Sequence, residues 1–209
     1  MPHRLTPAAA LLAALLTIAH LPAAEPDLSA GFPEPAKYEV VSADFRQIRR
    51  LKELDMEITI RGSMVSEKNG RLRWQVDSPS SSVTVIDRDK LTHFDRETGK
   101  LAVIRKEDLP WLKMLGESMN SWLSGDTARL KRDFTLSVPS PGTLRLVPAS
   151  EELRSFHRSV ELSFDGEKRT LRRILIVEPS GDELEILFSN VKLDSAIPPE
   201  TWRTPAPAE

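Results

Sequence analysis

Strict alternation along residues 56–64 constrains the fold of this chain more than any other sequence feature. The odd positions are all polar or charged, whereas the even positions hold Met56, Ile58, Ile60, Gly62 and Met64. A period of two is typical of a β-strand with one apolar and one polar face. At ~3.3 Å per residue such a strand is about 30 Å long. The sequence therefore predicts a long apolar stripe that must face an extended apolar partner.

Other alternating runs follow the same rule along most of the chain. Leu72 and Trp74 share one face of a predicted strand, and further runs occupy residues 82–86, 90–94, 134–138, 159–164 and 183–191. Turn residues separate these runs, including Asp165-Gly166 and the segment 179–182. Alternation with this punctuation is typical of antiparallel hairpins. We predict nine to eleven strands in a meander rather than alternating strands and helices.

One segment, residues 107–126, breaks the alternation. Its apolar residues recur every three or four positions, which is typical of an amphipathic helix: Trp111, Leu112, Leu115, Met119, Trp122 and Leu123. Asp108 is a suitable N-cap, Gly125 can end the helix, and Asp126 can cap a second short helix. The apolar side of the long helix must lie on the apolar face of the sheet, where it could act as a lid.

The N-terminus has the pattern of a secretory signal peptide. Arg4 precedes an apolar run from Ala8 to Leu21, and small residues follow. We expect residues 1–24 to be cleaved, residues 25–37 to form a proline-rich mobile leader, and 38–203 to form one domain with a tail at 204–209. No cysteine is present, so an exported domain would be held by its core alone.

The inventory of catalytic groups points away from an enzyme. The mature chain would contain two histidines, His93 and His157, both in or beside predicted strands, where a structural role is expected. The acidic pair Glu151-Glu152 and residues Glu183 and Glu185 are interpreted as solvated turns and strand faces. No nucleophile or phosphate-loop motif occurs, and ligands for transition metals are scarce. The near-neutral charge argues against a nucleic-acid partner.

Tryptophan and methionine carry the stronger signal. Trp111 and Trp122 lie on the apolar side of the predicted helix, and Trp74 lies on the apolar face of a strand. These side chains could be ordinary core, or they could line a cavity between helix and sheet. Methionine suits a surface that accepts variable apolar shapes, and Met56 and Met64 lie on the long stripe.

Several motifs, in order, resemble the periplasmic outer-membrane lipoprotein carrier proteins (LolA-like). They are FRQ at 45–47, the long strand ending at Gly62, RLRW at 71–74 with Pro79 beyond it, and ILFSNVKLDSAIPPETW at 186–202. The similarity runs from about Phe45 to Trp202. It implies a mainly β fold, a single strongly curved antiparallel sheet forming an unclosed half-barrel, with one or two helices over its concave face.

The resemblance also implies a function. Members of this family shield the acyl chains of lipoproteins in transit from the inner to the outer membrane. The implied partners are these acyl chains, an inner-membrane ABC lipoprotein-releasing transporter and an outer-membrane acceptor, with a monomeric protein, no catalytic residue, no metal and no cofactor. The implied cavity residues are Met56, Ile58, Ile60, Met64, Leu72, Trp74, Trp111, Leu115, Met119 and Trp122. An alternative is a regulatory module that senses lipids or lipoproteins with the same fold.

Two departures from the family pattern concern the lid. Pro33 and Pro35 interrupt the region where many members begin with an amphipathic helix, and KYEVV at 37–41 favours a strand. Lys68-Asn69 stands where classical carriers have an Arg-Pro pair, and lysine lacks the planar fork of arginine. Both departures leave the cargo open between a lipoprotein and another lipid.

Overall fold

Eleven strands form one antiparallel sheet in the computed structural model, which describes Leu28 and residues 35–87, 89–105, 121–124, 126–167 and 169–205. The strands are β1 (Val40–Leu51), β2 (Met56–Glu67), β3 (Leu72–Ser78), β4 (Ser82–Ile86), β5 (Lys90–Asp95), β6 (Leu101–Arg105), β7 (Phe134–Ser140), β8 (Thr143–Pro148), β9 (Ser159–Phe164), β10 (Leu171–Val177) and β11 (Glu183–Leu193). The predicted antiparallel sheet of nine to eleven strands is confirmed.

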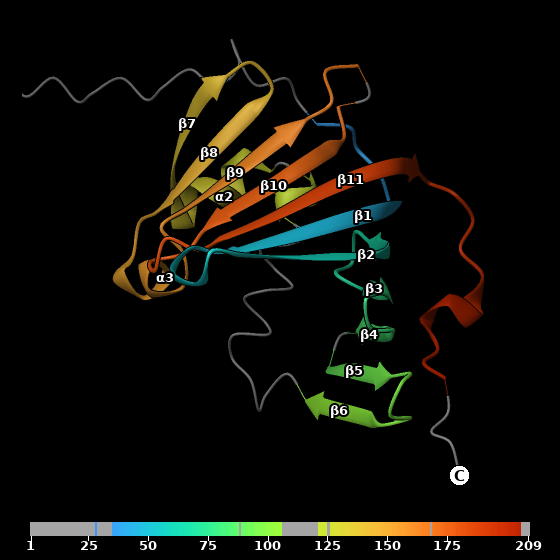
Figure 1. Ribbon diagram of the computed structural model, residues 1–209. Helices are drawn as coiled ribbons and strands as arrows, with labels where there is room; N and C mark the ends of the chain where they lie inside the picture. Colours follow the sequence, from blue (N-terminus) through green and yellow to red (C-terminus); the bar gives the residue numbers. More distant parts are fainter. Residues whose placement is uncertain are drawn as a thin grey trace, which may run out of the picture.

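The sheet consists of two meanders joined at its centre (Figure 1). The strand order is β6-β5-β4-β3-β2-β1-β11-β10-β9-β8-β7, so the first and last strands are neighbours. Their register runs from Val41 opposite Leu193 to Arg50 opposite Glu183. β6 and β7 are the two outer strands, and the sheet is an open one, as expected for an unclosed half-barrel.

Two short helices flank β7 and β8: one precedes β7, and the other lies between β8 and β9. The Asp126 side chain caps α2 (Thr127–Asp133) by accepting a hydrogen bond from the Arg129 amide at 3.0 Å, as the sequence predicts. Ser150 caps α3 (Glu151–Phe156), and its Oγ accepts from the Leu153 amide. Glu151 and Glu152, interpreted from the sequence as a solvated turn, form the first turn of α3, where acidic side chains favour a helix N-terminus.

The long predicted helix falls mostly outside the described residues. Residues 121–124 are helical, and Trp122 and Leu123 are buried. Trp111, Leu115 and Met119 lie outside the part of the chain that the structure describes. Within the described part, no helix combines the length and the apolar character needed to cross a membrane.

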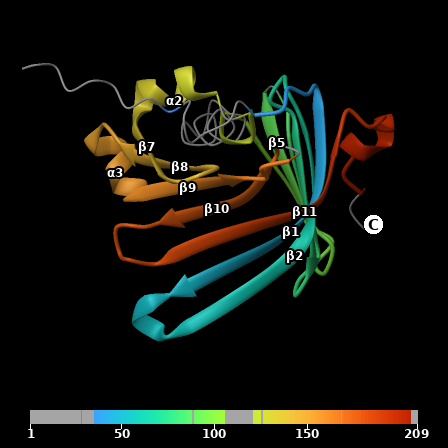
Figure 2. The same cartoon turned by 90° about the horizontal axis from the view of Figure 1, so that it is seen from above.

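The sheet is strongly bent, and its two faces are covered differently (Figure 2). α2 lies on the inner side of the bend, where Leu130 packs into the main core with Phe134 and Leu136 of β7. The segment after β11, which contains the 3₁₀ turn Pro199–Trp202, lies on the outer side. The inner face is therefore the one that α2 covers, as the half-barrel prediction requires.

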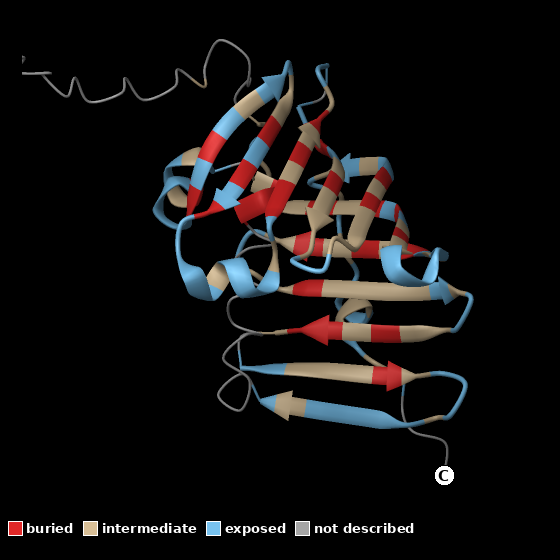
Figure 3. Ribbon diagram, turned by 60° about the vertical axis from the view of Figure 1, so that its left-hand side comes forward, coloured by how far each residue is buried: buried red, intermediate tan, exposed pale blue. Residues whose placement is uncertain are grey.

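Both meanders carry buried residues (Figure 3), and most of the described residues with 0% exposure lie in the second meander. Leu144, Leu146, Val160, Leu162 and Ile174 on β8–β10 are each fully buried, at 0% exposure. At the opposite edge, β6 carries no buried residue. The inner face of β1–β3 continues this core and becomes exposed toward the Met56 end of β2.

Candidate functional site

The predicted apolar stripe on β2 changes from buried to exposed along its length. In the β1–β2 register, its residues lie opposite the odd-numbered residues of β1, which include the core residues Ala43 and Phe45. Met64 is 1% exposed, Ile60 packs against the core, Ile58 is 38% exposed and Met56 is 51% exposed. The stripe thus connects the hydrophobic core to solvent along the inner face.

Phe45 and Trp74 continue this inner surface across β1, β2 and β3. Their ring centroids are 3.8 Å apart and their planes differ by 23°. Gly62 lies between them in the sheet, directly opposite Phe45. A Cβ atom at residue 62 would lie 2.8 Å from Phe45 Cζ and 1.8 Å from the Gln75 carbonyl oxygen. The glycine therefore leaves the space in which the aromatic side chains meet.

Other predicted site residues reach the same face from β3 and from the helical segment. Leu72 is buried beside Ile86 in the core, and its strand neighbour Trp74 is half-buried. Trp122 is 4% exposed and belongs to the same core cluster as Phe45 and Met64. Its indole Nε1 is buried, and no described residue accepts a hydrogen bond from it.

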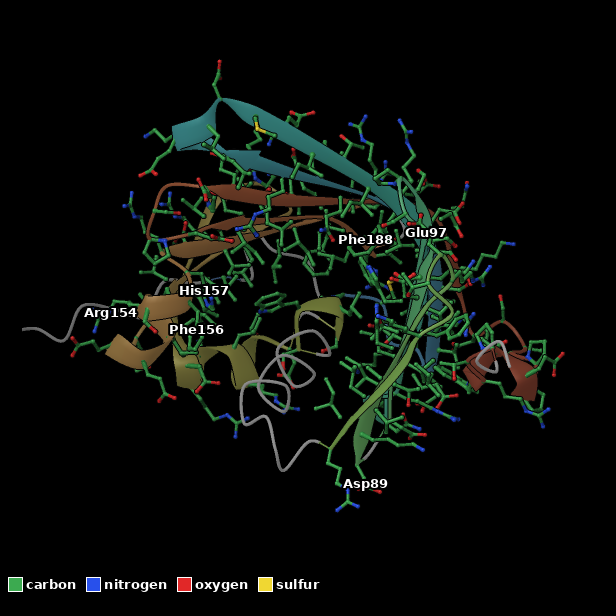
Figure 4. All side chains as sticks on the ribbon, turned by 60° about the horizontal axis from the view of Figure 1, so that its bottom comes forward. Asp89, Glu97, Arg154, Phe156, His157 and Phe188 are labelled. Atoms are coloured by element: carbon green, nitrogen blue, oxygen red, sulfur yellow. The ribbon has the colours of Figure 1, made fainter. Side chains whose placement is uncertain are left out.

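A small cavity lies where β1, β2 and β11 meet the start of β10. Its volume is about 10 Å³, roughly room for one water molecule. Ten of the described side chains line it, and eight of them are apolar: Val41, Ala43, Met64, Leu123, Leu171, Phe188, Val191 and Leu193. The other two are Tyr38 and Thr170. Figure 4 shows Phe188 on the inner side of the sheet, consistent with its 4% exposure.

Most of the residues that line this cavity were not predicted from the sequence. Val41, Ala43 and Phe45 alternate as the β2 residues do, so the signal was present in VVSADF. Tyr38 and Thr170 precede strands, where periodicity says nothing about side-chain direction. Their place in the wall becomes visible only from the backbone, because the Ala36 amide donates to the Arg169 carbonyl at 3.0 Å.

The outer face carries a ladder of alternating charge across six neighbouring strands. Its members, from β8 to β2, are Arg145, Glu161, Arg173, Glu185, Arg50 and Glu57. The shortest contacts join Glu185 to Arg173 and, at 2.9 Å, to Arg50. Between β8 and β2 the outer face therefore carries paired charges, whereas the inner face of the same strands is apolar and suits a hydrophobic ligand.

Glu185 is the most buried carboxylate of this ladder, with a side chain 12% exposed. Burial raises the pKa of this carboxyl group, but hydrogen bonds from Arg173 and Arg50 outweigh burial and hold the pKa below its usual value. The sequence interpretation of Glu185 as part of a strand face is correct, although the side chain is paired rather than simply solvated.

The two histidines have structural surroundings. His93 Nδ1 lies 2.9 Å from Thr84 Oγ1 on the neighbouring strand. His157 is the C-cap of α3 and stacks on Phe134 with ring centroids 5.9 Å apart. Burial lowers the pKa of His157. A search of the described residues finds no group of three or more side chains that could hold a metal ion.

Lys68 and Asn69 form the turn between β2 and β3. Lys68 Nζ contacts Glu39 Oε1 at 2.8 Å, and the Lys68 amide donates to the Glu39 carbonyl. Asn69 Oδ1 accepts from the Arg71 amide, which shapes the turn before Gly70, whose φ is +89°. These contacts therefore connect the end of β2 to the segment that precedes β1.

Comparison with known proteins places the chain among carriers. The family model described as "Outer membrane lipoprotein carrier protein LolA" matches residues 36–204. An outer-membrane lipoprotein carrier protein from Pseudomonas entomophila is 28% identical over 149 residues, covering 70% of this chain and 68% of the relative. A second, from Nitrosospira multiformis, is 28% identical over 169 residues, covering 80% and 79%. A LolA superfamily crystal structure from Nitrosomonas europaea has 11% identity, a TM-score of 0.42 and coverages of 85% and 96%.

Proposed function

Because the chain belongs to the outer membrane lipoprotein carrier (LolA) family, we propose that it carries lipoproteins through the periplasm by holding their acyl chains against the inner face of its sheet. The family consists of carriers rather than enzymes. The observation that carries the proposal is the continuous apolar surface from Met64 in the core to exposed Met56. Such a surface can cover an acyl chain, in which each buried methylene stabilises the complex by about 0.8 kcal/mol.

The proposed binding surface combines the predicted residues with the neighbours that the structure adds. The predicted set is Met56, Ile58, Ile60, Met64, Leu72, Trp74, Trp111, Leu115, Met119 and Trp122. Phe45 and Phe188 join it because they lie on the same inner face. A helix over residues 107–126 would cover this surface as a lid. A ligand that binds better to the open state than to the closed state would then displace the lid.

The proposed route begins with export by a cleaved signal peptide over residues 1–24. The protein would receive its cargo as a monomer from an inner-membrane ABC lipoprotein-releasing transporter and deliver it to an outer-membrane acceptor. The exposed end of the stripe, at Met56 and Ile58, supports exchange because an acyl chain can reach it without the core opening.

The decisive experiment is a release assay. Spheroplasts carrying a labelled lipoprotein are incubated with the purified protein, and the label in the supernatant is measured. We expect a soluble one-to-one complex with the lipidated cargo. The matched control is the same cargo with its acylated cysteine replaced by serine, which should not be captured.

A second preparation tests the regulatory alternative. Native mass spectrometry of the protein purified from its own periplasm should show a lipid or a lipoprotein bound to it. A stable complex with an unlipidated regulatory protein, combined with no capture of lipidated cargo, would contradict the carrier proposal.

A further inference from the structure

Two residues with buried hydroxyl groups line the small cavity, whose other described lining residues are apolar. Tyr38 Oη and Thr170 Oγ1 are both buried, and neither has a hydrogen-bond partner among the described residues. Thr170 is only 6% exposed, so its hydroxyl has no access to bulk water. Buried polar groups in native proteins nearly always have a partner. Two such groups without a partner in one cavity therefore point to a group that is supplied from outside.

The backbone holds both residues in place. The Ala36 amide donates to the Arg169 carbonyl at 3.0 Å, which joins the segment before Tyr38 to the residue before Thr170. On the other side of Tyr38, the Asp194 carboxylate accepts from the Glu39 amide at 2.7 Å. These bonds fix the backbone on both sides of Tyr38 and next to Thr170, so both residues are held where β1 and β10 begin.

The chemistry of the two groups favours an acceptor as their partner. Burial raises the pKa of the Tyr38 phenol, so this group stays protonated and available as a donor. A threonine hydroxyl can also donate. A carbonyl oxygen has two lone pairs and can accept from two donors at once. The cavity, at about 10 Å³, has room for one such oxygen but not for a whole chain.

An acylated lipid supplies one such oxygen at each ester linkage. The cavity lies at the rim of the sheet, where β1 and β10 begin and β11 ends. Met64 forms part of its wall and also begins the apolar stripe. Methionine is unbranched and adaptable, so it can move to admit a chain. A lipid whose ester lies at this rim can therefore run its methylenes along the inner face toward Ile60.

We propose, on the basis of the carrier function above, that Tyr38 and Thr170 form a polar subsite that donates hydrogen bonds to an acyl ester carbonyl of the bound lipid. The subsite discriminates ester-linked chains from chains of equal length that carry no carbonyl. It positions the glyceryl end of the lipid at the rim and the acyl chain on the apolar stripe.

The test compares two synthetic lipopeptides, one with two ester-linked hexadecanoyl chains and one with two ether-linked hexadecyl chains. Their Kd values are measured for the wild type, for Tyr38→Phe, for Thr170→Val and for the double variant. Loss of one neutral hydrogen bond lowers the affinity about five-fold. We expect each single variant to lose about five-fold for the ester and nothing for the ether. The double variant should bind both lipopeptides equally.

Stability measurements without lipid provide a second readout. Each substitution removes a hydroxyl that lacks a partner and keeps the shape of the side chain, so the variants should resist urea as well as the wild type or better. Thr135→Val, at an exposed position on β7, is the control for loss of a surface hydroxyl and should leave both Kd values unchanged.

Three results would overturn the subsite. If the wild type and all variants bind ester and ether with equal affinity, the subsite fails and the carrier function stands. If the variants lose stability without lipid and keep their ester affinity, the hydroxyls hold an ordered water only. If the wild type binds neither lipopeptide, the carrier function fails and the subsite fails with it.

Discussion

Phe45 and Trp74 stack across the inner face of the sheet with their ring centroids 3.8 Å apart. They come from β1 and β3, which are not neighbours, because β2 lies between them. The contact forms only because the intervening residue, Gly62, has no side chain. Residues from three of the sequence motifs, FRQ, the glycine that ends the alternating strand, and RLRW, thus meet at one place in the structure.

Gly62→Ala should therefore destabilise the protein by about 2 kcal/mol or more, the usual cost of overpacking a filled site. The added Cβ would lie 1.8 Å from the Gln75 carbonyl oxygen, so β2 and β3 would have to separate. Urea denaturation measures the loss. Gly166→Ala is the matched control, since a Cβ at residue 166 meets nothing within 4 Å. Equal stability of the two variants would contradict this role of Gly62.

Ile60→Glu should damage lipid binding more than folding. Ile60 is half-buried on the inner face, so a carboxylate there could stay hydrated without cargo but would meet acyl chains once cargo is bound. We expect at least a ten-fold loss of cargo capture and a loss of stability of about 1–2 kcal/mol. Ile174→Glu, at a position with 0% exposure, should abolish folding.

Thr59→Glu is the control for charge on the same strand, because residue 59 faces away from the inner surface. It should leave capture of lipidated cargo unchanged. Undiminished capture by Ile60→Glu would remove Ile60 from the binding surface. Equal loss of folding and capture would instead assign it to the ordinary core.

Glu185→Gln should reduce stability by about 1–2 kcal/mol at low salt, because it leaves the charges of Arg50 and Arg173 without the carboxylate between them. The loss should shrink in 1 M salt, where charges are screened within about 3 Å. Glu200→Gln, at an exposed position, serves as the control. A loss that does not change with salt would show that charge in the ladder contributes little.

His157 should make the protein less stable below neutral pH. Its pKa is lowered in the folded state by burial, whereas the unfolded value is about 6.5. The unfolded chain therefore binds the proton first, and the free energy of unfolding falls as pH decreases from about 6.5 toward the folded pKa. Glu185 adds a similar loss at more acidic pH, because its pKa is also lowered.

His157→Phe keeps a ring against Phe134 and removes the titrating group. Urea denaturation between pH 7.5 and 5.5 should show a flatter profile for this variant than for the wild type. Parallel profiles would mean that His157 contributes nothing to the pH dependence in this range.

The strands could be predicted from the sequence because alternating apolar residues indicate which face of each strand is buried. The β2 stripe, the hairpins and the Asp126 cap all follow from local patterns. The pairing of β1 with β11 has no local signal, because it joins residues at opposite ends of the domain. The half-barrel was anticipated through family motifs rather than through periodicity.

Prediction of the site was limited for a related reason. Alternation placed the even residues of β2 on one face. It did not predict that the exposed fraction rises along this face from buried Met64 to exposed Met56. That gradient depends on where the core over the inner face ends along β2, which is a property of the tertiary structure. Tyr38 and Thr170 precede their strands, so no period assigns them a direction.

The seam between β1 and β11 has a consequence for how the chain folds. Every other pair of adjacent strands in the sheet is consecutive along the chain. At this seam the Glu39 amide meets the Asp194 carboxylate across 155 positions of sequence. Closing so large a loop is slow compared with forming hairpins, so we expect this step to limit the folding rate. With the export proposed above, N-terminus first, the sheet could not be completed until the last strand had crossed the inner membrane.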